Sequence, residues 1–257
     1  MVINEVFLNP TVKTVAFEIR FPNLFFLESR VGDFQIEVMT RFPESKLLIR
    51  ANIILADLGP EGKAENLPKD RDSLAQKKIW SFRSESGIEL NLLTDSLNLQ
   101  STVHKTYNSD SVSAAERFRD TIDFVLSRFF KIFSVPIVTR IGLRYIDECP
   151  VPPLGDFEKW YSTTLPCGRF PLSDSVESKV VSRVKRGEYF FTYNELFRAT
   201  KDAMTLTLDF DSYAERIESE KCLEVTDRLH EIISKEYKNT LKEPVFEYMR
   251  RPKESKK

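Results

Sequence analysis

Alternation of apolar and polar residues recurs along this chain and constrains it to a fold rich in half-buried strands. Residues 15–21 place Val, Phe, Ile and Phe on one face and Ala, Glu and Arg on the other, which is the two-residue period of a strand with one buried side. Residues 137–147 repeat the pattern, with Arg140, Gly142 and Arg144 on one side. Shorter alternating or apolar runs predict further strands at 34–38, 47–55, 79–83, 88–92, 97–99, 180–184, 189–193 and 204–210.

Two segments change to helical spacing. The first begins near Ser113, which has Glu116 three residues later in a capping-box pattern, and its apolar stripe runs through 118–133. The second covers about 220–238, with Leu223, Leu229 and Ile233 on one side. A short helix or turn is predicted at 157–161. Amphipathic stripes of this kind are typical of helices that pack on a sheet.

The order of these elements predicts an α+β fold made of two similar halves. Each half is expected to be an antiparallel sheet of several strands followed by one long amphipathic helix packed on it. We assign residues 1–134 to the first half, 135–249 to the second, and 250–257 to a charged tail that is expected to fray. Residues 59–78 are rich in Gly, Pro, Asp and Lys without periodicity, which predicts a long surface loop.

Composition excludes several classes of protein. The chain has 38 Lys and Arg against 39 Asp and Glu, a net charge of −1, so no overall field attracts nucleic acid or an acidic membrane. No apolar run approaches the roughly 18 residues of a membrane-spanning helix, and the first residues lack a signal peptide's pattern, which together predict a cytoplasmic protein. Cys149, Cys167 and Cys222 are too irregularly spaced for a disulfide framework or a zinc motif, and only two His residues are present, so no metal is predicted.

Several sequence blocks carry a family resemblance. They are the segment from Asn9 to Val12, FEIRFP at 17–22, WSF at 80–82, RIGLRYID at 140–147 and LTLDFDSY at 206–213. Together they resemble an uncharacterised, sporadically distributed prokaryotic family of about this length, and the resemblance covers nearly the whole chain. The RIGLRYID block is the most specific, although Asp147 stands where the family pattern has Asn. The resemblance implies a prokaryotic origin and an accessory or defence-associated locus, and it implies no activity.

A first candidate binding site is a charged cluster of Glu18, Arg20, Arg140 and Arg144. These residues occupy the polar positions of strands that correspond in the two halves, so one cluster forms if those strands lie near each other. The arginine forks could hold a carboxylate or phosphate of a ligand. The alternative is an internal ion-pair network that fixes the halves together, with Arg144 bound to Glu18 or Asp209.

Two further segments suggest weaker sites. Asp209 and Asp211 share a strand face and could hold Mg²⁺, but a third acidic ligand is missing from the pattern. A basic patch precedes an aromatic run at 189–193, as in surfaces that bind a nucleic-acid backbone and stack bases, and its residues are Lys179, Arg183, Lys185 and Arg186. The alternative is a charged hairpin edge that prevents aggregation. His230 is expected at the surface or at the boundary of the core, and Cys222 is expected to be a buried thiol.

The sequence therefore favours a non-enzymatic binding or adaptor protein. It contains no GxSxG, P-loop or GxGxxG motif. Because the chain has only eight Gly, we expect no phosphate-cradling loop and hence no nucleotide cofactor. The expected ligand is a protein partner encoded nearby in a defence or toxin-control system, held on a sheet face or between the halves. The alternative function is that of a nucleic-acid-binding or metal-dependent nuclease subunit.

Overall fold

The computed structural model describes residues 5–51, 76–163, 165 and 170–252, and its nine described strands form one continuous antiparallel sheet. The strand order across the sheet is β2-β3-β4-β5-β1-β6-β9-β8-β7. The prediction of two separate sheets is wrong, because β1 pairs with β6 and joins the two halves of the chain. The strands are β1 Val12–Arg20, β2 Glu44–Ala51, β3 Gln76–Arg83, β4 Glu89–Leu92, β5 Ser96–Ser101, β6 Ile137–Cys149, β7 Glu177–Arg186, β8 Tyr189–Ala199 and β9 Met204–Glu218.

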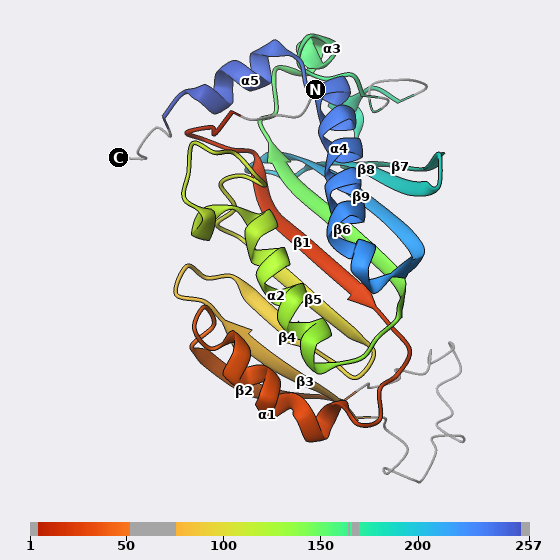
Figure 1. The fold of residues 1–257 in the computed structure, drawn as a ribbon. Coiled ribbons are helices and arrows are strands. Elements are labelled where there is room, and N and C mark those ends of the chain that lie inside the picture. The colour runs from red at the N-terminus through yellow and green to blue at the C-terminus, as the bar shows by residue number, and fades with distance from the viewer. Residues whose placement is uncertain (1–4, 52–75, 164, 166–169, 253–257) are drawn as a thin grey trace, which may run out of the picture.

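Three helices cover one face of this sheet. They are α1 Leu27–Val38, α2 Phe118–Ile132 and α4 Cys222–Thr240, and Figure 1 shows them side by side on the same side of the strands. The helices α3 Phe157–Trp160 and α5 Glu243–Arg250 lie together at one end of the molecule. No helix of the described segments lies over the opposite side of the sheet, which we call the open face (Figure 1). Short 3-10 helices complete the chain at Ala114–Glu116, Leu154–Asp156, Leu172–Asp174 and Ser219–Lys221.

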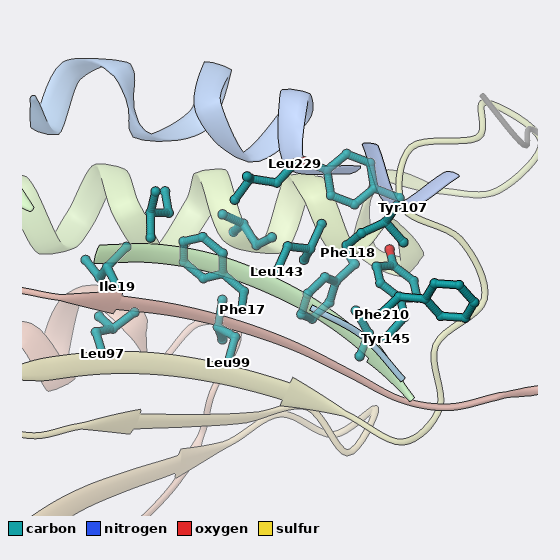
Figure 2. Close-up of a cluster of buried hydrophobic side chains, with 14 of the residues drawn as sticks. Phe17, Ile19, Leu97, Leu99, Tyr107, Phe118, Leu143, Tyr145, Phe210 and Leu229 are labelled. Atoms are coloured by element: carbon teal, nitrogen blue, oxygen red, sulfur yellow. The ribbon is translucent and has the colours of Figure 1, made fainter. Parts of the chain in front are cut away.

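The hydrophobic core lies between the sheet and these helices. Figure 2 shows Phe17 of β1 and Leu143 of β6, which face each other in register, beneath Phe118 of α2 and Leu229 of α4. All four side chains are buried, and burying one such side chain contributes roughly 1.5–3 kcal/mol. The alternation that predicted strands at 15–21 and 137–147 is confirmed, because its apolar positions form this core. The polar positions of the same strands consequently point to the open face.

The structure corrects the prediction of a strand at 34–38, which is the second half of α1. Leu27, Val31, Phe34 and Val38 are buried at spacings of four, three and four residues, whereas Ile36 is 68% exposed. This is the period of a helix, and it overrides the short alternation. The strand predicted at 47–55 is confirmed only as far as residue 51, since 52–55 lie outside the described residues. The same holds for most of the predicted loop at 59–78, although residues 76–78 belong to β3.

The helix boundaries also differ from those predicted. The capping box is present, with the Ser113 backbone N–H donating to Glu116, but it opens a 3-10 turn, and α2 itself begins at Phe118. The helix predicted at 220–238 is confirmed as α4. Helix α5 was not predicted, and it contains Arg250, which we had assigned to the fraying tail; Arg250 forms ion pairs with Glu5 and Glu243. Residues 253–257 of that tail lie outside the described part.

Candidate functional site

The open face carries a charged cluster where β1, β6 and β9 lie side by side. We call it the seam cluster; it consists of Glu18, Arg20, Arg140, Arg144, Asp209 and Asp211. Arg140 donates to Glu18 at 2.8 Å and to Asp211 at 3.3 Å, and Arg20 donates to Glu18 at 3.0 Å. The structure thus brings together all four residues of the predicted cluster. These contacts link the polar positions of three neighbouring strands.

Arg144 forms the best-aligned pair of this cluster. Its Nε and Nη2 atoms each donate to Asp209 at 2.8 Å, a bidentate geometry, and Asn194 of β8 donates to the same carboxylate at 2.9 Å. These hydrogen bonds to Asp209 raise the pKa of the Arg144 guanidinium above its usual value. Burial raises the pKa of Asp211, and the charges of Arg140 and Arg144 oppose the rise. Both aspartates are therefore engaged by arginine, which is the internal ion-pair arrangement rather than a metal-binding one.

Gly142 makes room for the Arg140 side chain. A Cβ atom placed on Gly142 would lie 2.8 Å from Nη1 of Arg140, so the guanidinium lies directly on the glycine backbone. In this position its carbon atom lies 4.6 Å from the centre of the Tyr213 ring, and that ring stacks on Phe190 at 5.1 Å. A cation–π contact of this kind contributes roughly 0.5–2 kcal/mol. The Arg140 side chain is thus held by the carboxylates of Glu18 and Asp211 and by the Tyr213 ring, in space that Gly142 leaves free.

The predicted basic patch is divided between the two faces of β7. Lys179, Arg183 and Lys185 are exposed on the open face, because they pair in register with Leu196, Thr192 and Phe190 of β8, in the same cross-strand rows as the seam cluster. Arg186 follows Lys185 directly and therefore points to the helix side, where it binds Glu236 of α4 at 3.1 Å. The structure therefore removes Arg186 from the patch.

The open face is hollowed on both sides of β5. One hollow, with a volume of about 540 Å³, extends over β2, β3, β4, β5 and β1. A second, of about 370 Å³, extends over β5, β1 and β6 and reaches Asp211 of β9. The two hollows share Glu18, Arg20 and Asn98 as lining residues, so they adjoin each other, and the smaller one reaches the seam cluster. We call these two adjoining hollows the open-face groove.

Amide and hydroxyl groups line the larger hollow. Asn91 of β4 donates to Asn98 of β5 at 3.3 Å, and Ser81 and Ser96 lie beside them. Charges of both signs are present, as Lys77 pairs with Asp95 at 2.9 Å. Although burial raises the pKa of Asp95, the hydrogen bond and charge of Lys77 outweigh it, and the pKa is lowered. These residues were not among the predicted site residues; their signal in the sequence is that they occupy polar positions that alternate with Leu90, Leu92, Leu97 and Leu99.

A second group of polar residues is buried on the helix side. Asp147, the departure from the RIGLRYI pattern noted above, is fully buried and accepts a hydrogen bond from Thr11 at 2.7 Å. Burial raises its pKa from 3.8 to about 7. Thr11 also lies 2.7 Å from the Tyr237 hydroxyl, which connects the start of β1 to α4. This group lies on the helix side of the sheet, and the charge of Asp209 in the seam cluster also raises the pKa of Asp147.

The two histidines belong to the same buried region. His230 stacks on Tyr107 at 3.9 Å, and it lines a cavity of about 80 Å³ together with His104 and Tyr145. Burial lowers the pKa of His230 to about 3 and that of His104 to about 4, so both rings are neutral near pH 7. The prediction of a surface or boundary position for His230 is wrong because the side chain is buried, whereas the buried thiol of Cys222 is confirmed. A cavity of this size holds a few water molecules at most.

The described segments contain neither a metal-binding cluster nor a membrane-spanning helix. Within the described segments, no group of three or more His, Cys, Asp or Glu side chains is arranged to hold a metal ion. No described helix is both long and apolar enough to cross a membrane. No family model, curated protein or solved structure matches the chain.

Proposed function

We propose that this protein is a non-enzymatic binding or adaptor protein that holds an extended segment of a protein partner in the open-face groove. The observation that carries this proposal is the groove itself, a hollow on a sheet face that no described helix covers. Its larger part has the volume of a typical ligand site, roughly 300–1,000 Å³. A partner lying there would cross the strands that join the two halves of the chain.

The chemistry of the larger hollow suits a polypeptide. Asn91 and Asn98 offer both donors and acceptors, as a peptide backbone requires. Leu48, Ile79 and Leu93 add apolar surface for side chains. Charges of both signs line the same hollow, which favours a protein segment over a ligand of uniform negative charge.

The same residues argue against catalysis. None of the described residues that line the larger hollow is His or Cys, the side chains that most often act as base and nucleophile. Glu18 is engaged by Arg20 and Arg140, and Asp95 by Lys77. The carboxylates of Asp209 and Asp211 are likewise held by guanidinium groups. These four carboxylates are thus all paired with basic side chains.

We further propose that the chain is an internal duplication. The strand order supports this, since β1, β5, β4 and β3 run outward from the centre on one side as β6, β9, β8 and β7 do on the other. In chain order, the last strand of each series, β5 or β9, is followed by a helix on the same face of the sheet, α2 or α4 (Figure 1). Strand β2 has no counterpart among the described strands. In this view the seam cluster marks the junction of two related units.

The prokaryotic family resemblance remains part of the proposal. The FEIRFP and RIGLRYID blocks lie on β1 and β6, the two central paired strands, so the most specific motifs surround the seam cluster. We infer a cytoplasmic role in a defence or toxin-control system, with a partner encoded nearby. Cys149 and Cys222 are buried free thiols, which suits a reducing compartment.

A display library of random twelve-residue peptides tests the proposed groove. We expect the full chain to enrich peptides whose binding weakens at least tenfold in Asn98→Trp, because the indole fills the hollow. Thr205→Trp is the matched control, since Thr205 is exposed on the open face of β9 and lines neither hollow. Failure to enrich peptides, or equal affinity of both variants, would refute the groove as a polypeptide site.

A further inference from the structure

The edge strand β7 presents a row of cations to the open face, outside the groove. Lys179, Arg183 and Lys185 share one side of the strand. At about 3.3 Å per residue, Arg183 and Lys185 lie about 7 Å apart and the whole row spans about 20 Å. The side chain of Val181, which stands between Lys179 and Arg183, is 56% exposed. We call these three cations the β7 strip.

Among the described residues, the strip has no ionic partner, unlike the other basic residues of the same hairpin. Arg198 pairs with Glu177 at 2.6 Å and Arg186 with Glu236 at 3.1 Å. No described acidic side chain forms an ion pair with Lys179, Arg183 or Lys185. Charges that only protect an edge strand from aggregation can be of either sign and can lie on either face of the strand. The three charges of the strip are all positive and all lie on the open face, so they are available to an anionic ligand.

The residues next to the strip suit a nucleic acid. The Lys185 ammonium lies 5.9 Å from the centre of the Phe190 ring, which stacks on Tyr213. Thr192 pairs with Arg183 in register in the neighbouring strand. Guanidinium and ammonium groups bind phosphates, a hydroxyl adds a hydrogen bond, and an aromatic edge nearby can contact bases.

From this arrangement we propose that the β7 strip binds the phosphodiester backbone of a nucleic acid. This site lies outside the proposed peptide groove, because none of the described residues that line either hollow belongs to β7 or β8, and β8 separates β7 from Asp211 of β9. Three phosphate contacts predict a salt slope of about −2 for a single strand and about −2.7 for a duplex. The affinity should accordingly fall about 20- to 40-fold between 50 and 200 mM salt.

Fluorescence anisotropy tests this with a labelled 20-nucleotide single strand, as DNA and as RNA, and with the corresponding duplex. The wild-type chain should bind at least one of them at 50 mM salt with a slope between −1.5 and −3. Lys185→Glu should weaken binding at least fivefold, and Arg183→Glu with Lys185→Glu should abolish it. Lys235→Glu, an identical substitution at an exposed position of α4 on the other face, should change affinity less than twofold.

Three results would overturn the proposal. The first is that none of the nucleic acids binds at 50 mM salt. The second is an equal loss in Lys185→Glu and Lys235→Glu, which would show that only overall charge matters. The third is that a polyglutamate peptide binds as tightly and with the same dependence on Lys185, which would assign the strip to acidic protein segments. Circular dichroism of each variant verifies that the fold is retained.

Discussion

Asp147 should make the stability of this protein depend on pH in an unusual direction. Its carboxyl group is fully buried, and burial raises its pKa from 3.8 to about 7. Between these values the folded state keeps a proton that the unfolded state has released. Unfolding then releases a proton, so the free energy of unfolding falls as pH rises, by about 1.4 kcal/mol per unit. The contribution is intact below about pH 4 and fully lost above about pH 7.

The substitution Asp147→Asn removes this titration while keeping an oxygen that can accept from Thr11. Urea unfolding of both proteins at pH 5, 6, 7 and 8 measures the effect. The stability of the variant relative to the wild type should rise by about 2–3 kcal/mol from pH 5 to pH 8 and flatten above pH 7. If the altered hydrogen bond with Thr11 changes the free energy of unfolding by the same amount at every pH, that change does not affect the pH dependence of the difference. Asp123→Asn, at an exposed position of α2, is the control; parallel profiles of wild type and Asp147→Asn would refute the reasoning.

Two further substitutions test individual contacts. Gly142→Ala should displace the Arg140 guanidinium and lower the free energy of unfolding by about 1 kcal/mol, as measured by urea unfolding. In an Arg140→Gln background the same substitution should not lower the free energy of unfolding further. An equal decrease in that background would show that the backbone, and not the contact with Arg140, is responsible. Asp227→Ala should cost about 1–2 kcal/mol because Arg119 loses a bidentate partner at 2.8 Å. In thermal unfolding, Glu231→Ala on the same helix should cost less than about 0.5 kcal/mol, and equal losses would contradict the assignment.

Strands were predictable where one face is buried and the other polar. Residues 15–21 and 137–147 have this pattern, and they became the central pair of the sheet. Residues 34–38 fit both periods, and only the preceding Leu27 and Val31 reveal the helix. Helix α5 was missed because Pro244 suggests a break, although proline is favourable in the first turn, where it stands.

The site was predictable in part, for a related reason. Alternation placed Glu18, Arg20, Arg140 and Arg144 on polar faces, but their meeting depends on β1 pairing with β6, a contact between residues more than a hundred positions apart. The same alternation already separates Lys185 from Arg186, so the division of the basic patch could have been predicted. The groove could not, because its walls come from β1 to β6 and from Asp211 of β9, and no local pattern determines the order of these strands.

Site-specific photocrosslinking tests the central claim that the open face is the binding surface. A p-benzoylphenylalanine at position 46, an exposed residue of β2 that lines the groove, is compared in host cells with one at position 235, on the exposed side of α4. We predict a discrete protein adduct from position 46 only, and its loss when Asn91→Trp fills the hollow. Adducts from position 235 alone, or an adduct from position 46 that persists in Asn91→Trp, would contradict the account.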